Sequence, residues 1–163
     1  MSGAMQEDVQ LLDEDSQKDK YLTFHLDDEC YGIEIKYVME IIGLQKITSV
    51  PEMPDFVRGI VNLRGKIIPV MDVRVRFKKP FREYMDRTCI IVIEMNELTI
   101  GLIVDSVAEV IAIPASDVVA PPEVNRRSNR FVMGIGKVGK EVKLLLDCEK
   151  LLNDHEVEQL LNN

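Results

Sequence analysis

The order of apolar and polar residues predicts short β-strands joined by tight turns. Residues Tyr21 to Leu26 alternate imperfectly between Tyr, Thr or His and Leu or Phe, which is typical of a half-buried strand. Three acidic residues at 27–29 predict a turn, and Cys30 to Ile35 is then the hairpin partner. The apolar runs Lys66 to Met71 and Val142 to Leu146 each follow a Gly-containing turn, so each predicts the second strand of a further hairpin.

One segment of the chain occurs twice. Residues 56–77 and 131–152 share a pattern of strand, turn, strand and short helical segment, and a shift of 75 positions brings identical residues together. The identities pair Phe56, Val57, Gly59, Ile60 and Asp72 with Phe131, Val132, Gly134, Ile135 and Asp147. Each Asp follows a strand and precedes a helical segment, where its side chain can accept an N–H of the first turn. We therefore predict both as helix N-caps.

A second block recurs in the same order. The sequence YVMEII at 37–42 returns as SVAEVI at 106–111 with a shift of 69, pairing Gly32, Val38, Glu40 and Ile42 with Gly101, Val107, Glu109 and Ile111. Two blocks in one order indicate an internal duplication. The second copy has extra residues within the polar segment 114–130, and the first has a proline-bracketed counterpart at 50–55. Because proline cannot donate a ladder hydrogen bond, both segments predict connections rather than central strands.

The predicted strands leave too little chain between them for crossover helices, which indicates an antiparallel all-β fold with short helices. We expect two small barrels, over residues 21–87 and 88–152, and a terminal helix at 153–161. A barrel of about 60 residues is marginal alone, so the two should share a hydrophobic seam. The acidic stretch 1–20 predicts a mobile tail.

Length and composition limit the classes of protein to which the chain can belong. The 163 residues suffice for one domain or two tightly fused halves. No apolar run predicts a membrane span and the N-terminus has no signal-peptide pattern, so we expect a cytoplasmic protein. Cys30, Cys89 and Cys148 lie far apart in apolar stretches, which favours reduced core thiols over disulfides or a zinc site.

The charge is unevenly distributed. A net charge of −8 argues against general affinity for nucleic acid, yet the segment 58–87 has nine Lys or Arg against three Asp or Glu. This segment predicts a basic face on an acidic body, and a solvated surface explains it equally well. It is the basis of one alternative function, a β-barrel that binds nucleic acid, although it lacks interleaved aromatic residues for stacking on bases.

No motif has a catalytic or cofactor-binding context. Gly134 to Gly139 match G-x-G-x-x-G, but a strand follows, and Glu141 stands where a phosphate-binding loop needs Ser or Thr. We predict a hairpin turn there. His25 and His155 lack metal-ligand spacing, and no cysteine has a nucleophile signature. We expect neither enzyme activity nor a bound metal or cofactor.

The turn Asn62-Leu63-Arg64-Gly65 is the strongest candidate for a binding feature. Asn and Gly satisfy the turn, and Arg64 places a planar cation with five donors at its tip, which suits a carboxylate on a partner. A solvated turn residue would show the same pattern.

Four segments together resemble the CheW-type coupling proteins of bacterial chemotaxis: YGIEIKYVMEI, PDFVRGIVNLRGKIIPVMDVRVRF, GLIVDSVAEVI and FVMGIGKVGKEVKLLLDCEKLL. The resemblance extends from Tyr21 to Leu161, and the run Gly59 to Val70 is its most specific part. It implies two pseudo-symmetric SH3-like antiparallel five-stranded barrels. It also implies a non-enzymatic scaffold, monomeric when isolated, that links methyl-accepting chemoreceptors to the histidine kinase CheA and reaches the membrane only through the receptors.

The resemblance also implies contact residues. The positions that match the family's receptor-contact region are Val38, Glu40, Gly59, Arg64 and Val110. For the kinase it implies Val124, at a position that is often aromatic in the family. The same domain occurs in CheV, fused to a receiver, and at the end of CheA. A fragment of either protein would therefore show the same sequence pattern as this chain. Because no such module accompanies the domain in these 163 residues, we interpret the chain as a stand-alone coupler.

Overall fold

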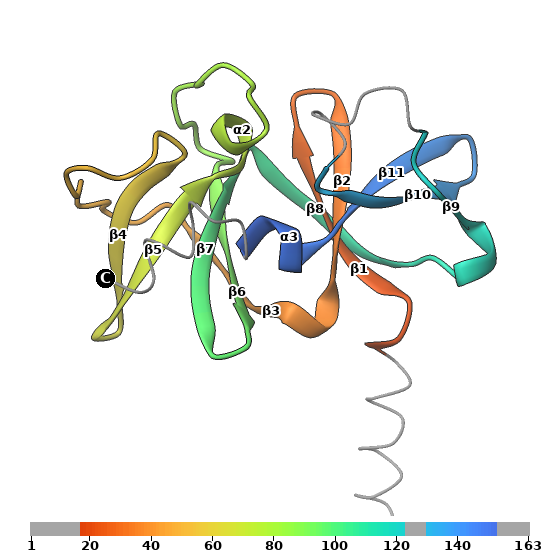
Figure 1. Ribbon diagram of the computed structural model, residues 1–163, viewed down its shortest axis with the longest axis horizontal. Coiled ribbons are helices and arrows are strands. Elements are labelled where there is room, and N and C mark those ends of the chain that lie inside the picture. The colour runs from red at the N-terminus through yellow and green to blue at the C-terminus, as the bar shows by residue number, and fades with distance from the viewer. Residues whose placement is uncertain (1–16, 123–129, 153–163) are drawn as a thin grey trace, which may run out of the picture.

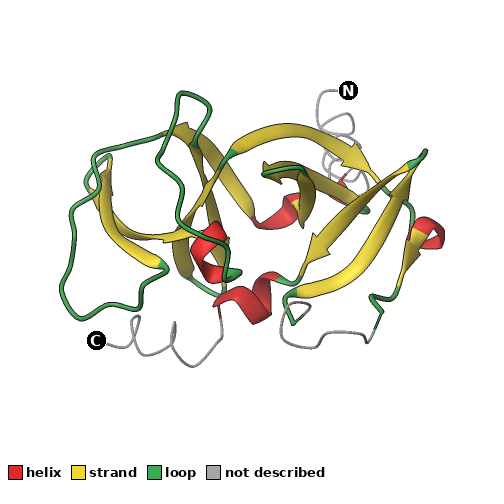
Figure 2. Cartoon of the chain, turned by 90° about the horizontal axis from the view of Figure 1, so that it is seen from above, coloured by secondary structure: helices red, strands yellow, loops and turns green. Residues whose placement is uncertain are grey.

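The computed structural model describes residues 17–122 and 130–152. Two β-sheets form neighbouring lobes, with two short helices between them (Figures 1 and 2). The terminal helix expected at 153–161, His155, Val124 and nearly all of the expected tail at 1–20 lie outside the described residues.

The chain forms eleven strands within the described residues. The five-stranded sheet, in the order β3-β6-β7-β5-β4, comprises β3 (Val38–Gly43), β4 (Val57–Leu63), β5 (Lys66–Asp72), β6 (Cys89–Met95) and β7 (Leu98–Val104). The six-stranded sheet, in the order β8-β1-β2-β11-β10-β9, comprises β1 (Lys20–Leu26), β2 (Glu29–Glu34), β8 (Ser106–Ala112), β9 (Val118–Val119), β10 (Val132–Val138) and β11 (Glu141–Leu146). The helical turns are η1 (Ile35–Tyr37), α2 (Val73–Arg76), η2 (Ala115–Asp117) and α3 (Cys148–Leu152).

The internal duplication is visible element by element. Strands β1, β2 and β3 correspond to β6, β7 and β8 at the predicted shift of 69, and β4, β5 and α2 correspond to β10, β11 and α3 at the shift of 75. Gly59 and Gly134 each follow a β-bulge in equivalent strands. Gly134 to Gly139 lie in β10 and its turn to β11, so this glycine motif is a hairpin as predicted.

The boundaries expected for the two barrels are wrong. The hairpin β6–β7, expected in the second barrel, completes the five-stranded sheet, and the hairpin β1–β2 belongs to the six-stranded sheet. The first hairpin of each repeat, β1–β2 or β6–β7, therefore pairs with the remaining strands of the other repeat. The exchange is made by two parallel pairs, β2 with β11 and β5 with β7, so neither sheet is wholly antiparallel.

Both predicted helix caps are present. The Asp72 carboxylate accepts hydrogen bonds from the backbone N–H of Arg74 (3.0 Å) and Val75 (3.4 Å) in α2, and from the hydroxyl of Tyr84 (2.9 Å). The Asp147 carboxylate accepts one from the N–H of Lys150 in α3 (3.3 Å). Each carboxylate satisfies a donor of the first turn, which has no partner within the helix.

The predicted hydrophobic seam joins the two sheets. Leu22 and Phe24 of β1 lie in one buried cluster with their repeat counterparts Ile91 and Ile93 of β6, and α3 adds Leu151. Two smaller clusters fill the sheets separately. Because the largest cluster draws on both sheets, burial of apolar surface holds the lobes together as one unit.

A buried arginine lies within this seam. The Arg76 side chain is sandwiched between Phe56 and Phe131, with its guanidinium carbon 4.3 Å and 4.7 Å from the two ring centroids. The two rings are counterparts in the duplication, so Arg76 lies where the repeats meet. Cation–π attraction here is stronger than at an exposed site, because Arg76 is only 3% exposed.

Candidate protein-binding site

The turn between β4 and β5 presents Arg64 to solvent. Leu63 pairs with Lys66, so Arg64 and Gly65 form a two-residue loop, and their φ angles are 52° and 89°. Positive φ at both positions is what a type I′ hairpin turn requires. The Asn62 side chain accepts a hydrogen bond from Gly65 N (2.8 Å), as its predicted turn role requires.

Arg64 has a carboxylate partner within the chain. Its Nη2 lies 2.5 Å from Oε1 of Glu40 on β3, and the two side chains are 72% and 29% exposed. Strands β3 and β4 are the two edges of the five-stranded sheet, so the sheet must curve for these residues to meet. The ion pair therefore bridges the two edges of the curved sheet and holds the guanidinium at its surface.

Gly59 has a structural reason for its identity. It lies in β4 with φ 143°, and a Cβ atom there would be 2.1 Å from the carbonyl oxygen of Thr48. That close approach lets Thr48 and Ile60 exchange two backbone hydrogen bonds of 2.8 and 2.9 Å. A side chain at Gly59 would break this bridge, so the residue shapes the barrel wall beside the Arg64 turn.

The two valines of the implied receptor region lie on different sheets. Val38 begins β3 and contacts the seam, whereas Val110 is 49% exposed on β8. Strands β3 and β8 are edge strands and counterparts in the duplication, and the counterpart of Val110 is Ile41 of β3. The structure brings Glu40 and Arg64 into contact and places Val110 on the other lobe.

Two exposed apolar residues beside Glu40 were not among the predicted contacts. Met39 and Ile41 are 60% and 46% exposed and alternate along β3 with half-buried residues. Apolar side chains on an exposed edge strand are a common feature of protein-binding surfaces. The signal was available in the sequence, because the shift of 69 pairs Ile41 with Val110.

The described residues show few features of other kinds of site. No group of three or more His, Cys, Asp or Glu within 17–122 and 130–152 could hold a metal ion. The three cysteines are free, and burial raises the pKa of the Cys148 thiol to about 12. Among the helices described, none is long and apolar enough to cross a membrane.

Comparisons with known proteins agree with this architecture. A sequence-family model described as a CheW-like domain matches residues 20–156. The chain is 35% identical over 139 residues to the chemotaxis protein CheW of Klebsiella aerogenes, covering 85% of this chain and 84% of the relative. It is 34% identical over 148 residues to that of Treponema pallidum, covering 86% of each chain.

A solved structure has the same fold. The scaffolding protein TtCheW from Thermoanaerobacter tengcongensis superposes with a TM-score of 0.78 at 38% sequence identity, covering 85% of this chain and 94% of that chain. The family match spans most of the sequence and includes both sheets and the Arg64 turn. The chain belongs to the CheW-like family of chemotaxis scaffolding proteins.

Proposed function

We propose that this protein is a cytoplasmic, non-enzymatic scaffold that couples methyl-accepting chemoreceptors to the histidine kinase CheA. The observation that carries the proposal is the Glu40–Arg64 ion pair beside the exposed apolar residues of β3. Receptor contact then falls on Val38, Glu40, Gly59, Arg64 and Val110. The kinase contact includes Val124. The membrane is reached only through the receptors, and the isolated protein is a monomer.

The geometry suggests how Arg64 recognises a receptor. Glu40 contacts one terminal nitrogen of the guanidinium, and the side chain remains 72% exposed, so its outward face can still grip a carboxylate. Glu40 fixes the direction of the guanidinium before binding, which reduces the entropy cost of association. The apolar side chains of Met39 and Ile41 supply burial next to this charged contact.

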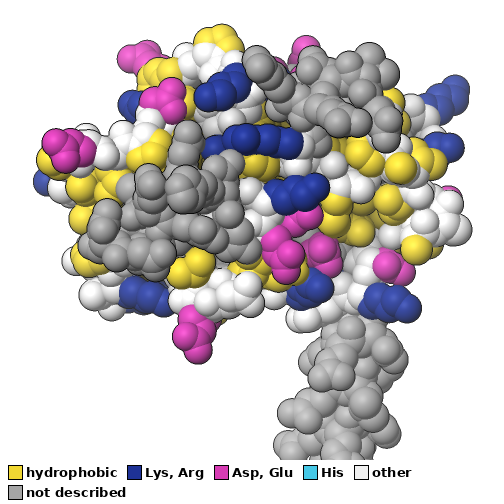
Figure 3. Space-filling model, in the orientation of Figure 1, with side chains coloured by type: hydrophobic (Ala, Val, Ile, Leu, Met, Phe, Trp, Pro, Cys, Tyr) yellow, Lys and Arg dark blue, Asp and Glu magenta, His cyan; other side chains and the backbone are white. Residues whose placement is uncertain are grey.

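The alternative of nucleic-acid binding loses its main support. Within the basic segment 58–87, Arg74 and Arg76 are buried, and Arg64, Lys79 and Arg82 form ion pairs with carboxylates of the same chain. On the face shown in Figure 3, Lys and Arg side chains are interspersed with Asp and Glu. Such cations are not a continuous track for a phosphate backbone.

The other alternative is a fragment of a CheV- or CheA-type protein, which would have the same domain and the same contacts.

Arg64→Ala tests the proposal. We expect the free energy of unfolding to change by less than about 0.5 kcal/mol, because an exposed ion pair contributes little to stability. Receptor binding should weaken by about 2 kcal/mol or more, and receptor-controlled kinase activity should be lost, because a receptor carboxylate would lose its partner. Binding to isolated CheA should be retained.

Two further variants sharpen the experiment. Lys66→Ala removes a neighbouring exposed cation of the same hairpin, which donates a hydrogen bond to Thr99, and should retain coupling. Arg64→Gly removes the guanidinium but suits the positive φ of the turn, so it should be at least as stable as Arg64→Ala. Normal receptor coupling in both Arg64 variants would contradict the proposed contact, and a large loss of stability in both would assign Arg64 to the fold.

A further inference from the structure

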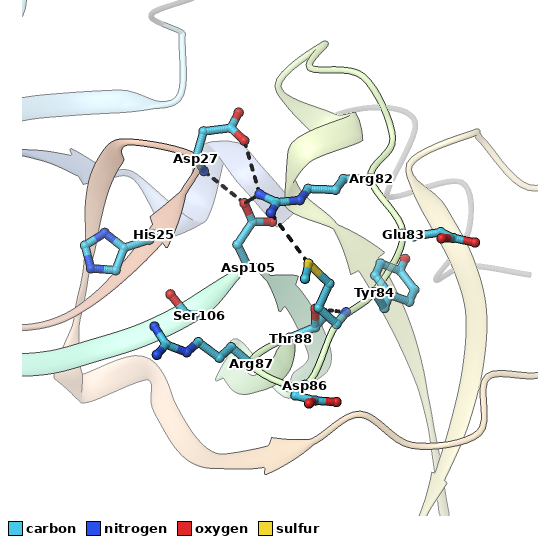
Figure 4. A pocket seen from close by; sticks show the side chains of 11 residues that line it. His25, Asp27, Arg82, Glu83, Tyr84, Asp86, Arg87, Thr88, Asp105 and Ser106 are labelled. Atoms are coloured by element: carbon cyan, nitrogen blue, oxygen red, sulfur yellow. Dashed lines mark hydrogen bonds and ion pairs between the residues drawn. The ribbon is translucent and has the colours of Figure 1, made fainter.

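A cleft of about 550 Å³ opens between the lobes, and none of the five proposed receptor contacts lines it. One side is formed by His25 at the end of β1 and by Asp105 and Ser106 at the junction of β7 and β8. The other side is the segment 82–88, which joins the two repeats (Figure 4). The volume is typical of sites for small molecules.

One wall of the cleft is held by a charge cluster. The buried Arg74 side chain places Nη1 2.8 Å from Asp27 Oδ1 and 2.9 Å from Asp105 Oδ2, and Asp105 Oδ2 also accepts a hydrogen bond from Asp27 N (2.9 Å). Arg82 Nη1 lies 3.5 and 3.6 Å from the same two carboxylates. Because two arginines already neutralise Asp27 and Asp105, these acids repel an incoming anion only weakly.

The segment 82–88 is held equally firmly. The Tyr84 hydroxyl donates to the buried Asp72 carboxylate (2.9 Å). Met85 and Thr88 close a turn through two hydrogen bonds, Met85 N to Thr88 Oγ1 (2.8 Å) and Thr88 N to Met85 O (3.1 Å). The cleft is therefore preformed, so a ligand would meet little cost of ordering its walls.

Three polar side chains in the cleft have no partner. His25, Ser106 and Arg87 make no side-chain hydrogen bond or ion pair with any residue in 17–122 or 130–152. Figure 4 shows Arg87 extending toward Ser106, with His25 beyond it. A guanidinium, a hydroxyl and an imidazole offer several donors together, whereas Asp27 and Asp105 are already engaged by Arg74 and Arg82.

We propose that this cleft binds a small organic molecule through an oxyanion, a carboxylate or a phosphate, held by Arg87, Ser106 and His25. The planar fork of Arg87 matches the two oxygens of such a group. Glu83 and Asp86 also line the cleft, and neither has an ion pair within the described residues. Their charges disfavour polyanions such as nucleotides and favour a ligand of low net charge, such as an amino acid.

The test is a titration of the whole protein followed by the NMR signals of its backbone amides. Aspartate and inorganic phosphate are added separately, and we expect at least one to cause saturable shifts at His25, Ser106 and Thr88. The probe that saturates identifies the oxyanion. Arg87→Ala should raise the Kd about tenfold or more, because it removes a charged hydrogen-bond donor. Lys137→Ala, which removes an exposed cation far along the chain in β10, should leave it unchanged.

Each outcome decides the proposal. Arg87 is exposed and has no partner, so its alanine variant is expected to fold, and an unchanged amide spectrum outside the cleft verifies this. An unsaturable response to both probes would overturn the site. The same would follow if Arg87→Ala and Lys137→Ala bound the probe equally well, since the shifts would then report general adsorption of anions.

Discussion

Arg64 has a left-handed backbone conformation, and the equivalent position in the second repeat is a glycine, Gly139. Its φ of 52° is close to the 61° of Gly139 in the β10–β11 turn. A left-handed φ costs a side chain about 1 kcal/mol, which the Glu40 ion pair can only partly offset. Retaining arginine at such a position is understandable if the guanidinium is needed for binding.

The sequence predicted the prominence of Arg64 but not its partner. Asn62 and Gly65 identify the turn locally, so the exposed arginine followed from residues next to it. Glu40 is 24 positions away and on the opposite edge of the sheet, and this contact depends on how far the sheet curves. Curvature of that kind arises from the pairing of strands that are distant in sequence. The alternation of apolar and polar residues along a single strand does not predict it.

Gly59→Ala should be strongly destabilising. The added methyl group would meet the Thr48 carbonyl at 2.1 Å, and a φ of 143° is unfavourable for any L side chain. We expect the free energy of unfolding to fall by about 2 kcal/mol or more in urea denaturation. Gly43→Ala is the matched control, because nothing lies within 4 Å of its added Cβ. Equal stability of the two variants would show that the β4 wall tolerates a side chain.

At the scale of elements, capping and duplication could be predicted because both depend on local spacing. Asp72 and Asp147 were recognisable from the strand before each and the helical segment after it, and both accept hydrogen bonds there. The link between separate elements could not be predicted. Arg74 of α2 joins the β1–β2 turn to the β7–β8 junction through Asp27 and Asp105, which are 78 positions apart.

This link makes stability depend on pH. The hydrogen bond from Arg74 lowers the pKa of Asp27 below its ordinary value, with further contributions from the charges of Arg74, Lys79 and Arg82. A group whose pKa is lowered by folding stabilises the protein above its unfolded pKa, about 3.9 for Asp, and this contribution is lost as the pH falls through the folded pKa.

Asp27→Asn should therefore destabilise the protein at about pH 6 and make a smaller difference at about pH 2, because the contribution of Asp27 is lost as the pH falls through a folded pKa that lies below the unfolded value. Urea denaturation at both pH values measures the difference. Asp117→Asn changes an exposed aspartate that has no ion pair among the described residues, so its effect should be small at both pH values. A destabilisation by Asp27→Asn that stays constant between the two pH values would contradict the electrostatic explanation.

At the scale of the whole molecule, the sequence repeats and the two sheets do not coincide. All strands of the five-stranded sheet lie within the continuous range 38–104, whereas the six-stranded sheet is assembled from both sides of that range. The chain is thus one continuous barrel inserted into a discontinuous one. The sequence indicated where the duplication lies, but the exchange of hairpins depends on the parallel pairs of β2 with β11 and β5 with β7. Those pairs join strands that are distant in the sequence, so no local pattern predicts them.

Two fragments of similar length distinguish these descriptions. Residues 35–105 contain the whole five-stranded sheet and its interior cluster, whereas residues 20–87 contain a hairpin of one sheet and three strands of the other. We expect the fragment 35–105 to unfold cooperatively with a free energy below about 5 kcal/mol, because it retains its own core but exposes the seam to water. The fragment 20–87 keeps neither parallel pair, so its strands lack the partners that complete a sheet. Circular dichroism during heating should show a cooperative transition for 35–105 and none for 20–87. The reverse result would mean that the repeat, rather than the sheet, is the unit that folds.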